Sequence, residues 1–146
     1  MKKYFLYLLV SIFIFSCAGK KEEKVVEKKY PNGKPEIEKY YSKDENDNRY
    51  LSKEVTYWPN SEKKIEGTYN KEQNRDGYWV AYHENGNKWS EGSYVDGVDD
   101  GRKTVWYENG QIYYQGTYKM GKQVGVWKFY DENGVLIREE DYGDRD

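Results

Sequence analysis

Few side chains in this sequence could act as a nucleophile, a general base or a soft metal ligand. The chain has 146 residues, with a single cysteine, Cys17, and a single histidine, His83. A Ser-His-Asp or Cys-His arrangement places a nucleophile beside a base, and a zinc site draws several ligands from Cys and His. His83 directly precedes Glu84-Asn85-Gly86, so we interpret it as a surface residue beside a turn. We therefore expect no enzymatic activity, no catalytic residue, no metal site and no cofactor.

Two acidic stretches invite comparison with calcium-binding loops. Residues 44–48 begin like an EF-hand loop, but Arg49 stands where that loop requires Gly and Val55 where it requires Glu. The second stretch, residues 96–101, contains three Asp and two Gly, as solvated turns commonly do. We interpret both stretches as ordinary loops.

The N-terminus has the features of a secretory signal peptide. Lys2 and Lys3 give a positive start, and the run 4–15 is apolar or aromatic except for Ser11. This run has 12 residues, whereas a helix that spans a bilayer needs roughly 20. The small Ser16 then precedes Cys17. We predict a signal peptide over residues 1–16.

Ile14-Phe15-Ser16-Cys17 resembles a bacterial lipoprotein signal, although Phe15 stands where Ala or Ser is usual. The resemblance implies that Cys17 becomes the first mature residue, that its sulfur carries a lipid, and that several acyl chains hold the protein on a membrane. It places the protein in the bacterial cell envelope. Ala18 gives no acidic retention signal, which favours the outer membrane or the cell surface. The alternatives are a plain signal peptide cut elsewhere and a retained hydrophobic anchor.

Residues 18–29 are mostly charged, contain no aromatic residue and show no clear period. We predict that residues 17–29 form a lipidated Cys followed by a charged tether. A short helix within this tether would not change its role as a spacer. The remaining residues, 30–146, are predicted to form one folded domain.

Composition limits the class of partner and the kind of core. The net charge is −2, which argues against nucleic acid as a partner because nucleic-acid binding needs a basic stripe. Charged residues make up 34% of the chain, yet 17 Tyr, 5 Trp and 4 Phe favour an ordered structure. A single cysteine cannot form an intramolecular disulfide. The core is therefore expected to consist of aromatic rings.

A tandem repeat fills the predicted domain. Gly86, Gly110 and Gly134 are spaced by 24 residues and each follows Glu-Asn, while Ser61 and Gly33 occupy the same place in two earlier units. A tyrosine follows each of these positions by eight residues: Tyr41, Tyr69, Tyr94, Tyr118 and Tyr142. A glycine follows three of them by six residues: Gly67, Gly92 and Gly116. Five units in register over residues 30–142 indicate a repeat architecture.

Each unit is predicted to be a β-hairpin. Asn-Gly favours a two-residue type I′ turn, in which both residues have positive φ, and β-forming residues flank each Asn-Gly. Glycine and asparagine recur too often for a helix, and residues 96–101 provide a second kind of connection between units. We predict an all-β fold: tandem antiparallel β-hairpin repeats that form one elongated, twisted sheet. A rolled-up sheet is the alternative.

Strand alternation assigns the aromatic residues to two faces. Trp79 and Ala81 are expected to share one face with Lys103, Val105, Trp127 and Phe129. Tyr82, Trp106 and Tyr130 are expected on the other face, and this row is the candidate binding surface, because rings in a line can stack on sugars. The alternative interpretation is that these rings only stabilise the sheet by cross-strand pairing.

The succession Gly-x-Trp, Glu-Asn-Gly and Glu-Gly-x-Tyr, best preserved over residues 77–127, resembles the MORN-repeat variant found in many bacterial proteins. Lys103 stands in one unit where Trp is expected, and Glu140 stands in the last unit where Gly is expected. The resemblance covers about four-fifths of the chain. It implies an array of β-hairpins that serves as an interaction module. Some bacterial relatives are labelled antitoxin or immunity components.

Taken together, these features predict a non-catalytic envelope lipoprotein that binds envelope proteins through the surface of its repeat sheet. The terminal strands offer edges to which a partner strand can pair. Two alternatives remain: a module that binds cell-wall glycan or another carbohydrate, and an antitoxin or immunity protein.

Overall fold

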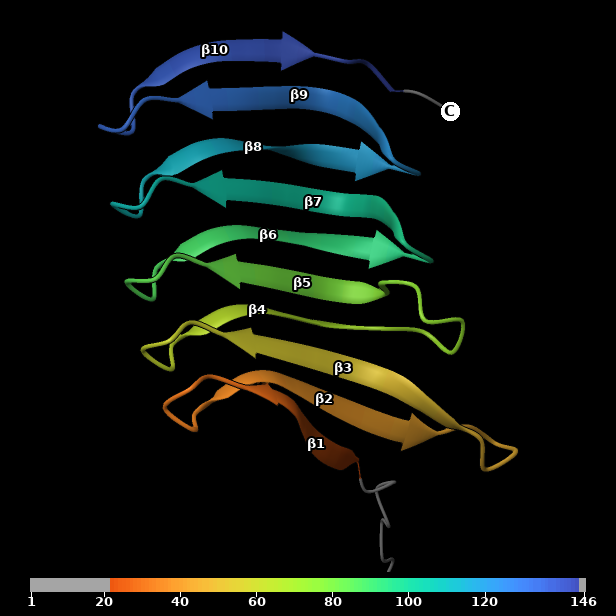
Figure 1. Ribbon diagram of the computed structural model, residues 1–146. Helices are drawn as coiled ribbons and strands as arrows, with labels where there is room; N and C mark the ends of the chain where they lie inside the picture. The colour runs from red at the N-terminus through yellow and green to blue at the C-terminus, as the bar shows by residue number, and fades with distance from the viewer. Residues whose placement is uncertain (1–21, 145–146) are drawn as a thin grey trace, which may run out of the picture.

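The computed structural model describes residues 22–144 and folds them into a single antiparallel sheet of ten strands whose order follows the chain from β1 to β10 (Figure 1). No helix occurs within this described part. The predicted all-β array of tandem hairpins in one elongated, twisted sheet is confirmed. The strands are β1 (Glu23–Lys29), β2 (Pro35–Lys43), β3 (Arg49–Tyr57), β4 (Lys63–Thr68), β5 (Gly77–Tyr82), β6 (Lys88–Val95), β7 (Val98–Trp106), β8 (Ile112–Lys119), β9 (Lys122–Tyr130) and β10 (Leu136–Asp141).

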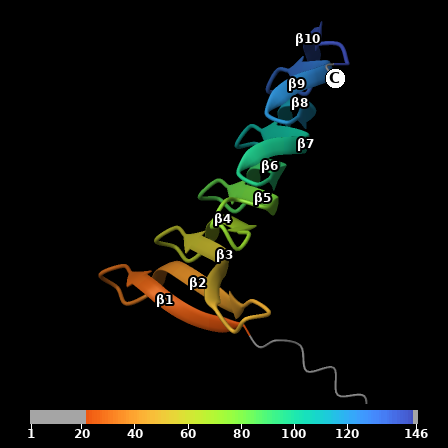
Figure 2. The same cartoon turned by 90° about the vertical axis from the view of Figure 1, so that its right-hand side faces the viewer.

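Residues 22–144 form a long, narrow ribbon, and no second layer from these residues covers either face (Figure 2). The five turns within hairpins lie along one side of this ribbon, which we call the turn side (left in Figure 1). The connections between hairpins lie along the other side. Residues 22–144 include no helix that is long and apolar enough to cross a bilayer.

The repeat domain begins earlier than predicted. Residues Glu23–Lys29, assigned to a tether from their charge, form β1 and pair antiparallel with β2. Their charged side chains are compatible with a strand because β1 is an edge strand, where charge protects against unwanted pairing. The predicted signal peptide at 1–16 and the lipidated Cys17 lie outside the described residues.

The hairpin turns are not of the predicted type I′. In the third hairpin, Gly86 has φ 86° but Asn85 does not have positive φ. The Gly86 N–H donates to the His83 oxygen at 3.0 Å, and the His83 N–H donates to the Asn87 oxygen at 2.8 Å. This pattern is a three-residue loop whose last residue is left-handed. The same pair of hydrogen bonds closes all five hairpins.

Two-residue turns with positive φ at both residues do occur, but on the opposite side of the sheet. Asp96 and Gly97 have φ 50° and 86°, and Met120 and Gly121 have φ 50° and 77°. The first of these turns connects β6 to β7, so most of the stretch 96–101 interpreted as a connection belongs to strand β7.

Every hairpin also contains a β-bulge at the same place. The register shifts at the third residue after the left-handed loop residue, so that this residue has no partner on the opposite strand. The bulged residues are Glu36, Lys64, Trp89, Tyr113 and Ile137, which we call the bulge row. A bulge redirects side chains relative to strict alternation.

Side chains are buried on both faces of the sheet. Trp79, Ala81, Val105 and Trp127 are buried on the face that we call the Trp face. Val55, Val80 and Thr104 are buried on the opposite face, which we call the Glu–Tyr face. The described part of the chain has no second sheet to cover them, so each buried side chain is covered by side chains of neighbouring strands on its own face.

On the Trp face, a glycine of one hairpin leaves room for the tryptophan of the next. Trp127 is 1% exposed, and its ring lies over Gly116, where an added Cβ would come within 2.2–2.6 Å of ring atoms. The Trp127 Nε1 donates to the Thr117 oxygen at 3.2 Å. Trp79 makes the same arrangement over Gly67.

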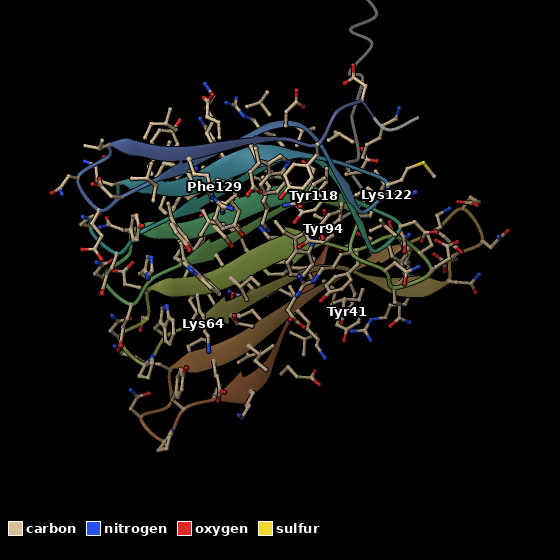
Figure 3. All side chains as sticks on the ribbon, turned by 90° about the horizontal axis from the view of Figure 1, so that it is seen from above. Tyr41, Lys64, Tyr94, Tyr118, Lys122 and Phe129 are labelled. Carbon is tan, nitrogen blue, oxygen red and sulfur yellow. The ribbon has the colours of Figure 1, made fainter. Side chains whose placement is uncertain are left out.

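Tyrosines complete the coverage of these rings. Tyr118 and Tyr142 contact Trp127 edge-on, at centroid distances of 5.0 and 6.2 Å. Tyr69 and Tyr94 contact Trp79 in the same way, at 5.1 and 6.4 Å. Figure 3 shows that Tyr94 and Tyr118, which hold the same place in successive hairpins, lie in line along the stack of strands.

Two units depart from this glycine–tryptophan arrangement. Lys103 replaces tryptophan, and its Cδ lies 3.0 Å from where a Cβ on Gly92 would stand. Glu140 replaces glycine in β10, where it pairs with Arg138 and accepts a hydrogen bond from the Tyr142 hydroxyl at 2.6 Å.

The two outer edges of the sheet differ in character. The β1 edge is rich in Lys and Glu and contains two register shifts. The β10 edge begins with Leu136 and Ile137, which are exposed. Charge and bulges protect an edge, and β10 also has both, in the bulge at Ile137 and in its charged residues 138–141. Only its first two residues, which are apolar and exposed, leave this edge open to pairing.

We predict that Gly116→Ala destabilises the protein by about 3 kcal/mol, the upper range for overpacking, because the new methyl group meets the rigid, buried Trp127 ring. Gly92→Ala is the matched control and should cost less than about 1 kcal/mol, since the flexible Lys103 side chain can move away. Urea unfolding measures both. Equal losses for the two variants would contradict this account of the glycines.

Candidate interaction surface

Asparagine side chains join successive turns along the turn side. In the third hairpin, the Asn85 Oδ1 accepts the Asn87 N–H at 2.9 Å, which holds the loop closed. The Asn85 Nδ2 donates to the Glu108 oxygen of the next turn at 3.2 Å. Asn60 and Asn109 make the same pair of bonds in their hairpins. Each Asn thus closes its own loop and also fixes the next one, a role that the Asn-Gly pattern alone does not reveal.

A second ladder runs beside the first and uses the residue before each loop. Its side-chain donor reaches the backbone oxygen of the last strand residue before the next loop. The bonds are Tyr30 Oη to Tyr57 O (2.7 Å), Trp58 Nε1 to Tyr82 O (3.1 Å), His83 Nε2 to Trp106 O (3.3 Å) and Tyr107 Oη to Tyr130 O (2.9 Å).

His83 is therefore one member of a structural ladder. A carbonyl oxygen only accepts hydrogen bonds, so the His83 Nε2 must carry the proton in this contact. Its place in the ladder is taken by Tyr107 in the next hairpin and by Trp58 in the previous one. Within residues 22–144, no nucleophile or carboxylate makes a hydrogen bond with this imidazole.

The predicted row Tyr82, Trp106 and Tyr130 lies together on the Glu–Tyr face, opposite the Trp face. The Tyr82 hydroxyl donates to Glu66 at 3.2 Å, and the Tyr130 hydroxyl accepts from Gln115 Nε2 at 3.1 Å. The Lys88 ammonium lies 5.6 Å from the Trp106 ring centroid. The three rings are half-buried and are engaged by neighbouring side chains, so the structure favours the sheet-stabilising interpretation. Their role in binding remains a prediction.

Glu38 is the most buried acidic residue of the Glu–Tyr face, at 3% exposed. Its carboxylate pairs with the Lys24 ammonium at 2.6 Å and accepts the hydroxyls of Tyr57 and Tyr40 at 2.8 and 3.1 Å. Burial alone would raise the pKa of Glu38, but these hydrogen bonds outweigh it and leave the pKa below its usual value. Lys24 thereby ties β1 to the rest of the sheet.

The bulge row forms a different surface, on the Trp face near the turns. In the three middle hairpins, the bulge residue contacts the ring that precedes the loop of the same hairpin. The Lys64 ammonium lies 4.4 Å from the Trp58 ring centroid. The ring centroids of Trp89 and His83 are 6.4 Å apart, and those of Tyr113 and Tyr107 are 4.9 Å apart. Strict alternation would have placed these residues on the other face, which is why sequence reasoning missed this surface.

A hollow of about 330 Å³ opens between the second and third hairpins on this surface. Ile65 and Ala81, which pair across β4 and β5, form its floor. Trp58 and Trp89 line it from either hairpin, and Trp89 is 53% exposed. Ala81 leaves the space open because it is the smallest residue at its place in the repeat, where other hairpins carry Thr56, Val105 or Phe129.

The two acidic stretches are occupied by internal contacts. The Asp44 Oδ1 accepts the N–H groups of Asn46 and Asn48, both at 2.8 Å, and Asp47 pairs with Lys43 at 2.8 Å. Asp96 accepts from Asn70 and Asn74 at 3.0 and 2.6 Å. Within the described residues, no group of three or more His, Cys, Asp or Glu could hold a metal ion.

Ten antiparallel strands in chain order form five hairpins with the same loop and the same bulge, which defines a protein built from tandem β-hairpin repeats. Comparison with known families identifies the repeat. The family described as MORN repeat variant matches residues 22–43, 75–96, 99–120 and 123–144, so the chain belongs to that family. Comparisons with curated proteins and with solved structures give no match. Members of the family are generally non-catalytic, and MORN repeats commonly act as protein- or membrane-interaction modules.

The four matches correspond to hairpins β1–β2, β5–β6, β7–β8 and β9–β10. The hairpin β3–β4 lies outside them but has the same loop, the same bulge and the same ladder contacts. The structural repeat therefore has five units.

The place of His83 in the second ladder gives a prediction about stability. His83→Ala removes a donor to the Trp106 oxygen and leaves that carbonyl without its partner, which should cost about 1–2 kcal/mol in urea unfolding. His83→Tyr should recover most of the loss, because tyrosine fills this place at Tyr107. If both variants lose the same stability, the ladder contact is not what His83 supplies.

The depressed pKa of Glu38 predicts a loss of stability in acid. A carboxylate with a lowered folded pKa stabilises fully above its unfolded pKa of about 4.3, and this contribution disappears as the pH falls through the lower folded value. Glu38→Gln should therefore reduce stability at pH 7 by roughly 1–3 kcal/mol. It should also flatten the decline in unfolding free energy below about pH 4.5.

The exposed Glu72 provides the control for this measurement. Glu72→Gln should leave unchanged both the unfolding free energy at pH 7 and its decline below about pH 4.5. If the unfolding free energy of Glu38→Gln falls in acid as steeply as that of the wild type, the acid dependence does not arise from Glu38.

Proposed function

We propose that this protein is a non-catalytic lipoprotein of the bacterial cell envelope that binds envelope proteins through the surface of its repeat sheet. The observation that carries the proposal is the open sheet itself, since no other element of residues 22–144 covers either face, and both faces present side chains along their whole length. Exposed aromatic residues occur on both faces, with Tyr78 51% exposed on the Glu–Tyr face and Trp89 53% exposed on the Trp face. Extended surfaces of this kind suit the recognition of other proteins.

The membrane anchor in this proposal is a lipid on Cys17. It is supported by the sequence, which has a short apolar run followed by Ser16 and Cys17. A lipid at residue 17 would lie close in sequence to β1, which starts at Glu23, and would hold that end of the sheet near the membrane. The long axis of the sheet would then carry the later hairpins away from the bilayer.

Carbohydrate binding is less well supported than protein binding. The row proposed to stack on sugars consists of half-buried rings, and the hydroxyls of Tyr82 and Tyr130 are already hydrogen bonded. No feature of the described residues favours an antitoxin or immunity role over general protein binding.

Metabolic labelling tests the anchor. The full-length chain should incorporate labelled palmitate and fractionate with membranes, and Cys17→Ala should lose the label because the acylated sulfur is gone. Cys17→Ser is the isosteric control and should behave in the same way. Label retained in Cys17→Ala would refute lipidation at this residue.

Site-specific photo-crosslinking in cells tests the interaction. A photoreactive phenylalanine analogue is placed in the full-length chain at Tyr78, at Tyr113 or at Ile137, which sample the two faces and the β10 edge. Glu72, in the connection between β4 and β5, is the control position. At least one of the three surface positions should give a discrete adduct with an envelope protein that the control does not give. Adducts no stronger than those at Glu72 would refute the interaction function.

A further inference from the structure

The hollow between Trp58 and Trp89, with Ile65 and Ala81 as its floor, carries an inference about what the sheet binds. It is apolar at its base and aromatic at its sides, and Lys64 and Glu108 also line it. A ligand group that enters would lie between two indole rings. The chemistry of the rim therefore decides which group fits.

The turn side of the rim is acidic. Glu84 and Glu108 both line the hollow and occupy the same place in successive loops. Their backbone oxygens are used by the asparagine ladder, whereas no hydrogen bond or ion pair within residues 22–144 involves either carboxylate. Two unpaired carboxylates therefore line the same hollow as the exposed ring of Trp89.

The protein itself shows how a cation sits at this surface. The Lys64 ammonium lies over the Trp58 ring, 4.4 Å from its centroid, and Lys64 and Trp58 both line the hollow. Lys64 holds the same place in the second hairpin that Trp89 holds in the third. No cation of the described chain covers Trp89, so one indole is occupied by an internal cation and the other is left open.

We propose that this hollow, which we call the Trp58–Trp89 site, receives an arginine side chain from an exposed basic segment of a partner protein. The planar guanidinium stacks on the Trp89 ring, and its N–H groups donate to the carboxylates of Glu84 and Glu108. Arginine fits better than lysine because its flat group stacks on an indole and donates to carboxylates at the same time. This inference rests on the proposed interaction function and names the chemistry of one partner contact.

Charge complementarity favours a basic protein segment over a glycan. A neutral sugar would use the rings but would leave both carboxylates without a counter-charge. Because the contact has an ionic part and an aromatic part, the two can be removed separately by substitution.

Binding to the full-length chain in nonionic detergent tests the proposal. The probe is the peptide acetyl-Gly-Gly-Arg-Gly-Gly-amide, compared with the same peptide carrying citrulline, which keeps the shape of arginine but has no charge. The readout is the indole N–H resonance of Trp89, assigned with Trp89→Phe. The arginine peptide should shift this resonance saturably, and the citrulline peptide should bind at least tenfold more weakly.

Matched variants separate the contributions. Glu84→Gln/Glu108→Gln should weaken arginine-peptide binding at least fivefold, as followed at the Trp89 resonance. Glu72→Gln/Glu132→Gln removes the same charge outside the hollow and should leave binding within twofold of wild type. Trp89→Ala, followed by calorimetry, should abolish binding, whereas Tyr113→Ala, at the same place in the next hairpin, should not.

Three results would overturn the proposal: equal binding of the citrulline peptide, equal weakening by the control double variant, or a Trp89 shift caused by an N-acetylglucosamine oligomer but not by the arginine peptide.

Failure of the arginine site is distinguishable from failure of the proposed interaction function. If the arginine peptide does not bind but photo-crosslinking still gives an envelope adduct, only the Trp58–Trp89 site is refuted. Loss of both results refutes the interaction function as well.

Discussion

The structure depends on contacts between neighbouring hairpins, because an unlayered sheet has nothing else with which to cover its side chains. Trp127 lies over Gly116 and is covered by Tyr118 of β8 and by Tyr142, which directly follows β10. Trp79 is buried in the same way between β4 and β6. Each hairpin is therefore completed by the hairpins on either side of it, and stability is expected to follow a nearest-neighbour pattern. On the turn side, neighbouring hairpins also stabilise one another, through the asparagine ladder and through the second ladder formed by the ring before each loop.

Much of this fold could be predicted from the sequence because its signals are local and repeated. The 24-residue spacing of Gly86, Gly110 and Gly134 identified the hairpins, and alternation placed Trp79 and Tyr82 on opposite faces correctly. The turn type could not be read in this way. Asn-Gly favours a type I′ turn in an isolated hairpin, but here the Asn side chain closes a three-residue loop and reaches the next loop, a contact between hairpins that a local motif does not show.

The strand β1 and the bulge row were missed for related reasons. Residues 23–29 are so highly charged that they suggest a tether. The ion pair between Lys24 and the buried Glu38 joins two strands of the folded sheet, so the local sequence does not reveal it. The bulge shifts Trp89 out of strict alternation, so a period of two assigns it to the wrong face. The candidate site on the bulge row could have been found only by noticing that the same residue in all five hairpins falls where the register shifts.

Glu140 gives the last described strand a different surface from that of the inner strands. Gly67 and Gly116 each leave a vacancy into which the ring of the following hairpin fits, whereas Glu140 fills its own place with a side chain held by Arg138 and Tyr142. A sixth hairpin with tryptophan at the usual position would have no room for its ring there. The β10 edge of the described sheet therefore lacks the open glycine that receives a tryptophan ring at Gly67 and Gly116. A neighbouring strand could pair with this edge only with a smaller or more flexible side chain at that place, as Lys103 has beside Gly92.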